Sequence, residues 1–179
     1  KMKNLMIYIS PEKKFLGEME SLVKRQIDNS FNLGWKKEDI VLVTNFPYEY
    51  GGTKAIVVND KINNADIIVY LLVNGIVKEA EIWWYHDLDV LQLKPMDSSQ
   101  IDFGDTVAGF TDNGTDKLDT GNIFFRTDSE KLFEWMRNRA HRLRSDEATA
   151  LSTLVDENYR NIGVLYKKIK LDEMFEHQK

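Results

Sequence analysis

Two short apolar runs near the start of the chain, separated by a helix-periodic stretch, constrain the fold most. Asn4–Ile9 and Asp39–Thr44 have the length of single strands and are rich in large aliphatic residues, as buried strands are. Pro11 suits a first helical turn, Gly34 suits a helix end, and apolar residues recur between them at helical spacing: Phe15, Leu16, Met19, Leu22, Val23 and Ile27. A strand, a helix and a strand in this order predict the beginning of an α/β sheet.

The middle of the chain continues this alternation. The apolar stretch Lys61–Val77 is compatible with a strand or a buried helix; its length favours a helix, ended by Asn74 and Gly75. Ala80–His86 is aromatic and predicts a strand. An antiparallel element is expected near residues 105–126, and a helix at Ser129–Leu143.

The last part of the chain predicts further helices. One spans Asp146–Tyr159, with Ser145 as its N-cap and acidic residues in its first turn. Residues 160–179 are charged and amphipathic and predict a peripheral C-terminal helix. We therefore expect residues 1–179 to form a single α/β domain, with a mostly parallel central sheet and flanking helices.

Composition excludes several classes of protein. The chain has no cysteine, which rules out disulfide scaffolds, thiolate zinc sites and cysteine nucleophiles. Its net charge is −5, so the chain lacks the excess of basic residues that nucleic-acid binding requires, and no nucleic-acid partner is expected. No apolar run reaches the length of a membrane span, and no signal peptide is evident, so a soluble, cytoplasmic protein is expected.

The sequence feature with the clearest chemical meaning is the pair Asp87 and Asp89. It follows the apolar strand Ala80–His86 directly, without positive neighbours, near the middle of the chain. Carboxylates separated by one residue at a strand end can converge on a hard divalent cation such as Mg²⁺ or Mn²⁺. Such a cation neutralises a diphosphate as it leaves.

Three segments in chain order resemble the GT-A-fold glycosyltransferases, especially the small enzymes of this family found in viruses and phages. Ile82–Asp89 resembles the family's Asp-x-Asp strand end. Leu118–Arg126, with the helix after it, is similar to the Asn-x-Gly strand that faces the donor sugar and the acceptor. Ser145–Leu151 resembles the late helix start that places a carboxylate beside the transferred sugar, and Lys54 matches a lysine often found before the metal motif.

The resemblance extends from Asn4 to about Tyr159 and implies a GT-A (Rossmann-like) fold and an activity. The implied activity is metal-dependent, hexosyltransferase-like transfer of a sugar from a nucleotide-diphosphate sugar, most simply a UDP-sugar. The acceptor would be a hydroxyl on a glycan or glycoprotein, and the cofactor Mn²⁺ or Mg²⁺. A viral member would act in the host cytoplasm.

The resemblance also assigns roles to individual residues. Asp87 and Asp89 would hold the metal on the diphosphate, with Leu88 between them, and Lys54 would compensate phosphate charge or order these carboxylates. The nucleotide would be cradled by the ends of the first two strands, at Ile9, Ser10 and Thr44.

Further residues would face the transferred sugar. Asp119 and the backbone at Gly121 would orient it. Asp146 or Glu147 would be the base of an inverting reaction, or would stabilise the sugar face in a retaining one.

The chain departs from the family pattern at two points. Asp119 stands where the family usually has Asn, so that its side chain can only accept from a sugar hydroxyl when ionised. Many relatives supply a late metal ligand, often a histidine. The late histidines here, His141 and His177, lie in no matching motif, which leaves the third ligand unassigned.

Other interpretations of the same residues stay open. The strand followed by Asp87 and Asp89 also resembles the motif of haloacid-dehalogenase-type phosphatases, in which Asp87 would be the nucleophile and Asp89 the acid/base. That motif normally opens the domain, whereas here 86 residues precede it. A non-catalytic sugar-nucleotide-binding module is a third class. Asp146 and Glu147 also suit any helix start, and the arginines of 137–144 complement a helix C-terminus.

Overall fold

A computed structural model of the chain describes residues 1–59, 63–112, 117–171 and 173–177. Its centre is a seven-stranded sheet in the order β10-β8-β9-β6-β1-β2-β5. Every neighbouring pair in it is parallel except the two pairs that β9 makes, with β6 and β8. The strands are β1 (Met2–Tyr8), β2 (Ile40–Thr44), β5 (Ile56–Val57), β6 (Ile82–His86), β8 (Ala108–Asp112), β9 (Leu118–Phe125) and β10 (Tyr166–Ile169).

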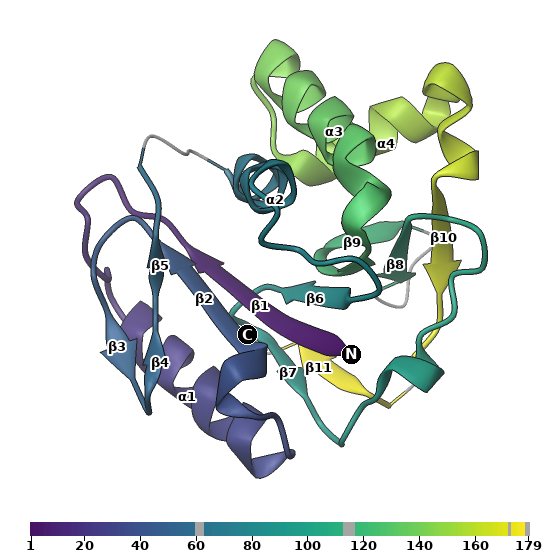
Figure 1. Cartoon of the computed structure of the whole chain (residues 1–179). Coiled ribbons are helices and arrows are strands. Elements are labelled where there is room, and N and C mark those ends of the chain that lie inside the picture. Colours follow the sequence, from purple (N-terminus) through teal and green to yellow (C-terminus); the bar gives the residue numbers. More distant parts are fainter. Residues whose placement is uncertain (60–62, 113–116, 172, 178–179) are drawn as a thin grey trace.

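Helices cover both faces of this sheet (Figure 1). On one face lie α2 (Asn64–Val73), α3 (Glu130–Leu143) and α4 (Glu147–Asp156), which form the largest core cluster with residues such as Trp83 and Tyr85 of β6. On the other face α1 (Met19–Asn32) packs against β1 and β2. Trp84 lies on that second side, because successive side chains of a strand alternate between the faces of the sheet.

Two small sheets extend the second face. β3 (Glu49–Tyr50) and β4 (Thr53–Lys54) form a hairpin, and β7 (Val90–Gln92) pairs antiparallel with β11 (Phe175–His177). Short 3-10 helices connect the larger elements: η1 (Lys37–Asp39), η2 (Ser98–Gln100), η3 (Thr127–Ser129) and η4 (Tyr159–Val164).

The structure confirms the α/β architecture, the strand at 82–86, the helix within 61–77, the antiparallel element and the helix of 130–143. Residues 61 and 62 of the predicted second helix lie outside the described residues. The first helix begins at Met19 and not at Pro11, because Lys13 and Gly17 adopt positive φ angles of 55°, which a helix excludes.

Two predictions near the C-terminus are wrong. The N-cap of α4 is Asp146 and not Ser145, since the Asp146 carboxylate accepts the Thr149 N–H at 2.7 Å. The predicted peripheral helix over 160–179 is replaced, within the described residues, by η4, β10 and β11. The free edges of β8 and β7 provide backbone hydrogen-bond partners for this tail, and a sequence pattern does not reveal such edges.

No helix within the described ranges is long and apolar enough to cross a membrane.

Candidate active site

The polar residues of interest lie at one edge of the central sheet. The parallel strands β1, β2 and β6 end there, at Tyr8, Thr44 and His86, and the antiparallel β9 begins there at Leu118. In open α/β sheets the carboxyl ends of the parallel strands are where ligands bind. The turn from β6 to β7 carries Asp87 and Asp89 across this edge.

Asp87 is held from two sides. Its backbone N–H donates to the Gly121 carbonyl at 2.8 Å, and its Oδ1 accepts a hydrogen bond from the Tyr85 hydroxyl at 2.9 Å. Oδ2 lies over Gly121, only 2.1 Å from where a Cβ at that position would stand. The glycine therefore makes room for the carboxylate.

Asp119 and His177 form a pair beside Asp87. The Asp119 Oδ1 accepts the Gly121 N–H at 2.8 Å, and its Oδ2 lies 2.9 Å from the His177 Nε2. His177 reaches this place because β11 pairs with β7 in a register that sets it opposite Val90, next to Asp89 in the chain. Residues from three distant parts of the sequence thus meet around one glycine.

The surroundings of Asp87 penalise its negative charge. Part of the residue is open to solvent, yet its carboxylate is packed closely enough that desolvation raises its pKa. Repulsion from Asp89 and Asp119 raises the pKa of Asp87 further, while the Tyr85 hydrogen bond and His177 lower it. The site holds an excess of negative charge that a cation would relieve.

A chain of hydrogen bonds joins Asp87 to Glu147. Tyr85, fully buried, accepts a short hydrogen bond from the Asn64 side chain, and the Asn64 backbone N–H donates to Glu147 Oε1 at 2.9 Å. The starts of α2 and α4 are therefore tied to the end of β6. Desolvation, and then the charge of Asp87, raise the pKa of Tyr85 well above 10.

Glu147 is the most strongly perturbed carboxylic acid near this edge. Burial raises its pKa to about 7, although the backbone N–H groups of Ala65 and Asn64 partly oppose the shift, and the charges of Asp87 and Asp66 add to it. A carboxylic acid with this pKa exchanges its proton near neutral pH, which is the property a general acid or base needs.

Helix α1 holds the turn that carries Asp87 and Asp89. The buried Gln26 of α1 donates from Nε2 to the carbonyls of Leu88 and Val90, at 2.9 and 2.8 Å. The Leu88 side chain is itself buried in the cluster formed with α1. Asp89 is exposed, and no hydrogen bond or ion pair within the described chain fixes its carboxylate.

The ends of the first two strands are joined to each other. The Asn45 side chain donates to the Ser10 carbonyl at 2.7 Å and accepts the Ser10 N–H at 3.1 Å. Ser10 and Thr44 are buried, and Ile9 packs on the main core. The structure thus brings Ile9, Ser10 and Thr44 to the same edge as Asp87, with the backbone groups of Ser10 bonded to Asn45 and its hydroxyl donating to Glu12.

Two predicted site residues have other surroundings. Lys54 lies in the β3–β4 hairpin opposite Glu49, where neighbouring residues Tyr48 and Tyr50 bond to α1 through Glu20 and Asp28. Asp146 is exposed and caps its own helix, and the hydrogen bonds from Thr149 lower its pKa. Of the adjacent acids 146 and 147, Glu147 is the one connected to Asp87.

Sequence reasoning missed Tyr85, Asn64 and Gln26, and left His177 without a role. Each of these residues is a polar side chain within a largely apolar element, and this is the only signal that the sequence contains. Such a signal does not reveal which partner the side chain binds. His86 is buried, with Nε2 2.7 Å from the Asn4 Oδ1. Burial lowers the pKa of His86 to about 4, so it is neutral at neutral pH.

The residues at this edge have the right chemistry for a hard divalent cation. Within the described residues, no three His, Asp or Glu side chains already stand close enough together to enclose an ion. Yet Asp87 has one oxygen bound by Tyr85 and the other directed over Gly121, Asp89 is unrestrained, and His177 is adjacent. Carboxylate oxygens are the donors that suit Mn²⁺ or Mg²⁺.

Sequence comparisons give no match: no protein-family model and no curated protein matches the chain. Solved structures do match. A glycosyltransferase involved in glycosylation of the major capsid of PBCV-1 superposes with a TM-score of 0.57 and 13% identity, over 94% of this chain and 81% of that chain.

Two other glycosyltransferases superpose similarly. GlyE of Streptococcus pneumoniae gives a TM-score of 0.60 at 11% identity over 94% of this chain, which spans only 46% of GlyE. The galactosyltransferase LgtC gives 0.54 at 11% identity, over 85% of this chain and 70% of that chain. At such identities the likeness defines the architecture alone. The chain therefore has the GT-A glycosyltransferase fold.

Proposed function

We propose that this chain is a metal-dependent glycosyltransferase that moves a sugar from a nucleotide-diphosphate sugar, most simply a UDP-sugar, to a hydroxyl of a glycan or glycoprotein. The observation that carries the proposal is the meeting of Asp87, Asp119 and His177 around Gly121, beside Asp89. It occurs at the edge of a GT-A sheet where ligands of such folds bind. The fold of the solved glycosyltransferases supports the reaction class.

Asp87, Asp89 and His177 are the residues that would hold Mn²⁺ or Mg²⁺. When bound, the cation would neutralise the charge on the diphosphate leaving group. The protein's own part is orientation: Tyr85 fixes one Asp87 oxygen, and Gln26 fixes the turn that carries Asp89. Asp119 is held at Oδ1 by the Gly121 N–H and at Oδ2 by His177, and the remaining lone pairs of its ionised carboxylate could accept from a sugar hydroxyl.

Glu147 is the candidate base of an inverting reaction, or the group that stabilises the sugar face in a retaining one. Because its pKa is about 7, a large fraction of Glu147 is ionised at neutral pH, and the carboxylate is a stronger base than one with an ordinary pKa. Asp146 is the weaker candidate, because its carboxylate already caps α4 and its pKa is lowered. The proposal gives Glu147 this role and Asp146 a structural one.

Calorimetric titration of UDP-glucose, UDP-galactose and GDP-mannose, with and without Mn²⁺, tests the metal role. Asp89→Ala should abolish the Mn²⁺-dependent part of donor binding without changing the fold, because Asp89 is exposed and makes no internal hydrogen bond among the described residues. Asp105→Ala removes an equally exposed carboxylate elsewhere and should leave donor binding unchanged. Unaltered Mn²⁺-dependent affinity in Asp89→Ala would refute the metal role.

Turnover separates the proposal from its alternatives. A glycosyltransferase should hydrolyse or transfer from at least one donor sugar when Mn²⁺ is present. Turnover of p-nitrophenyl phosphate in place of donor turnover would favour a phosphatase using Asp87 and Asp89. Donor binding with no turnover across the panel would favour a non-catalytic module.

A further inference from the structure

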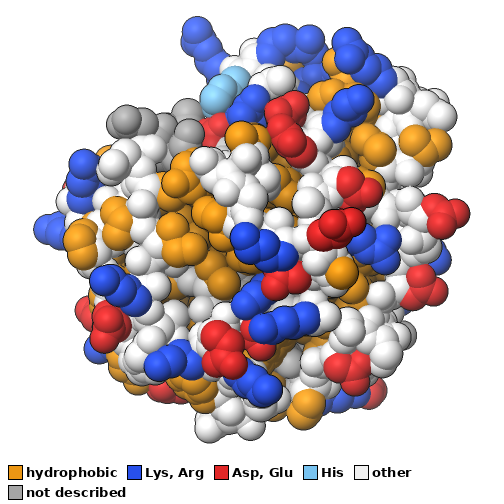
Figure 2. Space-filling view, viewed as in Figure 1, with side chains coloured by type: hydrophobic (Ala, Val, Ile, Leu, Met, Phe, Trp, Pro, Cys, Tyr) orange, Lys and Arg blue, Asp and Glu red, His pale blue; other side chains and the backbone are white. Residues whose placement is uncertain are grey.

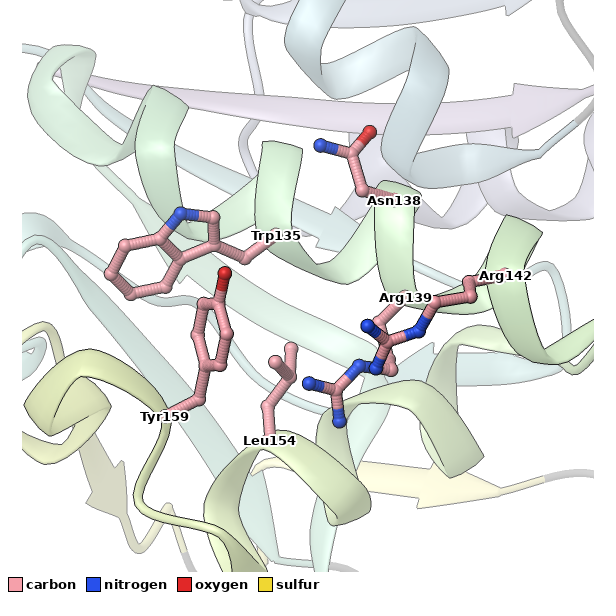
Figure 3. A pocket seen from close by; sticks show the side chains of 6 residues that line it. All are labelled: Trp135, Asn138, Arg139, Arg142, Leu154 and Tyr159. Atoms are coloured by element: carbon pink, nitrogen blue, oxygen red, sulfur yellow. The ribbon is translucent and has the colours of Figure 1, made fainter.

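A cavity lies away from the sheet edge, between α3, α4 and η4. Its volume is about 120 Å³, and it is lined by Trp135, Asn138, Arg139, Arg142, Leu154 and Tyr159. Figure 3 shows the two aromatic rings on one side of it and the two guanidinium groups on the other, with Leu154 between them. A cavity of about 150 Å³ in another protein encloses one benzene ring, so this smaller cavity can enclose only part of a hexose, and the rest of the sugar would lie in solvent.

One wall of the cavity contains a buried guanidinium group. Arg139 is only 5% exposed, and its guanidinium donates to Thr153 Oγ1 and to Glu157 Oε2, each at 2.9 Å. It also lies 5.4 Å from the centre of the Tyr159 ring. A guanidinium has five N–H donors, so a group fixed by these two bonds retains donors for a ligand.

A second cation in the wall has no partner. Arg142 is exposed, and it makes no hydrogen bond or ion pair with any residue that the structure describes. None of the six described residues that line the cavity is acidic, and Glu157, which contacts Arg139, is already paired with it. Figure 2 shows Lys and Arg side chains gathered along the upper edge of the molecule, where Figure 1 places α3. In a chain with a net charge of −5, this local surplus favours an anion.

The opposite wall offers ring surface and one unused N–H donor. Trp135 and Tyr159 meet edge to face with ring centres 5.1 Å apart. The Trp135 indole N–H differs from the other indoles, since it donates to no acceptor in the described ranges. The others donate as follows: Trp35 to Gln92, Trp83 to Glu81 and Trp84 to Asn122.

Tyr159 is held in this wall by an unusual backbone. The residues around it, Asn158, Arg160 and Asn161, have φ angles of 48°, 47° and 61°, the left-handed region that costs free energy for residues other than glycine. Arg160 also lies 5.3 Å from the Tyr159 ring. The chain thus adopts a strained turn directly after α4, at the position that brings Tyr159 against Trp135.

We propose that this cavity binds a single hexose unit that carries a carboxylate or a phosphate. Arg139 and Arg142 would bind the anionic group, the aromatic pair and Leu154 would contact the apolar side of the ring, and the Trp135 N–H and Asn138 would serve its hydroxyls. The choice of a sugar over other anionic rings rests on the proposed function. Leu154 follows Glu147 by two helical turns, about 10 Å along α4, which places the cavity within reach of a longer acceptor glycan.

Binding is measured on ¹⁵N-labelled protein without metal or donor, by following the indole N–H resonance of Trp135. The probes are glucuronate and glucose 6-phosphate, compared with glucose and inorganic phosphate. We expect both anionic sugars to shift this resonance saturably, and glucose or phosphate alone to bind at least roughly tenfold more weakly. Arg142→Gln should weaken glucuronate binding roughly tenfold, since it removes a charge-assisted contact.

Arg144→Gln is the matched control, because it removes the same charge near the end of α3 but does not line the cavity. Equal binding of inorganic phosphate would overturn the sugar part of the proposal, and equal binding of glucose would overturn the role of the arginines. No shift with any probe would overturn it altogether. Asp89→Ala should bind glucuronate normally and Arg142→Gln should bind the donor normally, so that this proposal and the proposed function fail separately.

Discussion

At the scale of single residues, Gly121 decides where the Asp87 carboxylate lies. A Cβ at position 121 would stand 2.1 Å from Asp87 Oδ2 and 2.7 Å from its Cγ, far inside van der Waals contact. The same residue bonds Asp87 through its carbonyl and Asp119 through its N–H. The absence of a side chain is therefore what permits the two carboxylates to approach each other.

Gly121→Ala should displace Asp87 and remove Mn²⁺-dependent donor binding. Overpacking of this kind costs about 1–3 kcal/mol of unfolding free energy, measurable by urea denaturation. Gly163→Ala is the control, since a Cβ there meets nothing within 4 Å. Donor affinity that survives in Gly121→Ala would show that the Asp87 position is irrelevant to binding.

Tyr85 acts on Asp87 rather than on a ligand. The Tyr85 hydroxyl donates a hydrogen bond to Asp87 Oδ1. Tyr85→Phe should therefore remove this bond and leave the Asp87 carboxylate less firmly oriented. Removal of such supporting hydrogen bonds typically lowers metal affinity roughly tenfold or more. Mn²⁺ titration followed by electron paramagnetic resonance, without donor, measures this. The Tyr166 hydroxyl makes no hydrogen bond within the described chain, so Tyr166→Phe should leave Mn²⁺ affinity unchanged. An equal loss of affinity in Tyr166→Phe would contradict the role given to Tyr85.

At the scale of secondary-structure elements, two packed segments shape the turn that carries Asp89. α1 lies under the turn and holds it through Gln26, and β11 lies beside it through its pairing with β7. Asn29 of α1 donates to the Gln92 carbonyl at 2.9 Å and continues this contact along β7. The geometry of the motif thus depends on elements far from it in the sequence.

Gln26→Met keeps the length of the side chain but leaves the carbonyls of Leu88 and Val90 without their donor. Because both are buried against α1, we expect a loss of about 1–3 kcal/mol in unfolding free energy. Amide exchange at residues 88–90 should accelerate. Arg25→Met, an exposed neighbour on α1, serves as the control. Unchanged exchange at the turn in Gln26→Met would show that α1 does not restrain it.

At the scale of the whole molecule, a buried histidine and a half-buried glutamate make stability depend on pH in opposite directions. The pKa of His86 falls from 6.5 to about 4, so the folded state binds fewer protons than the unfolded one, and stability is lost as the pH drops through this range. The pKa of Glu147 rises from 4.5 to about 7, so the folded state binds more protons. Its contribution therefore declines as the pH rises from 4.5 to about 7.

Glu147→Gln isolates the second contribution, since the amide oxygen can still accept the Asn64 N–H and His86 is unchanged. The variant should gain stability over the native chain as the pH rises from about 5 to about 8, by at most about 3 kcal/mol. Urea denaturation across this range measures the difference. A stability difference that stays constant with pH would show that Glu147 titrates normally in the folded protein.

Much of the fold follows from local patterns in the sequence. The apolar runs that became β1, β2 and β6 and the helical periodicity of α3 act over neighbouring residues, so they can be recognised without tertiary information. The Asp87 and Asp89 pair was recognisable for the same reason, since a carboxylate pair at a strand end is a local feature.

Only the tertiary structure decided which side chains meet. His177 reaches the Asp119 carboxylate because the tail pairs with β7 as a strand, where local charge patterning had predicted a helix. Asn64, Tyr85 and Glu147 form one chain of hydrogen bonds although up to 83 residues separate them. The physical reason is that hydrophobicity and propensity depend on near neighbours, whereas hydrogen bonds at strand edges and between helix ends depend on partners that only folding brings together.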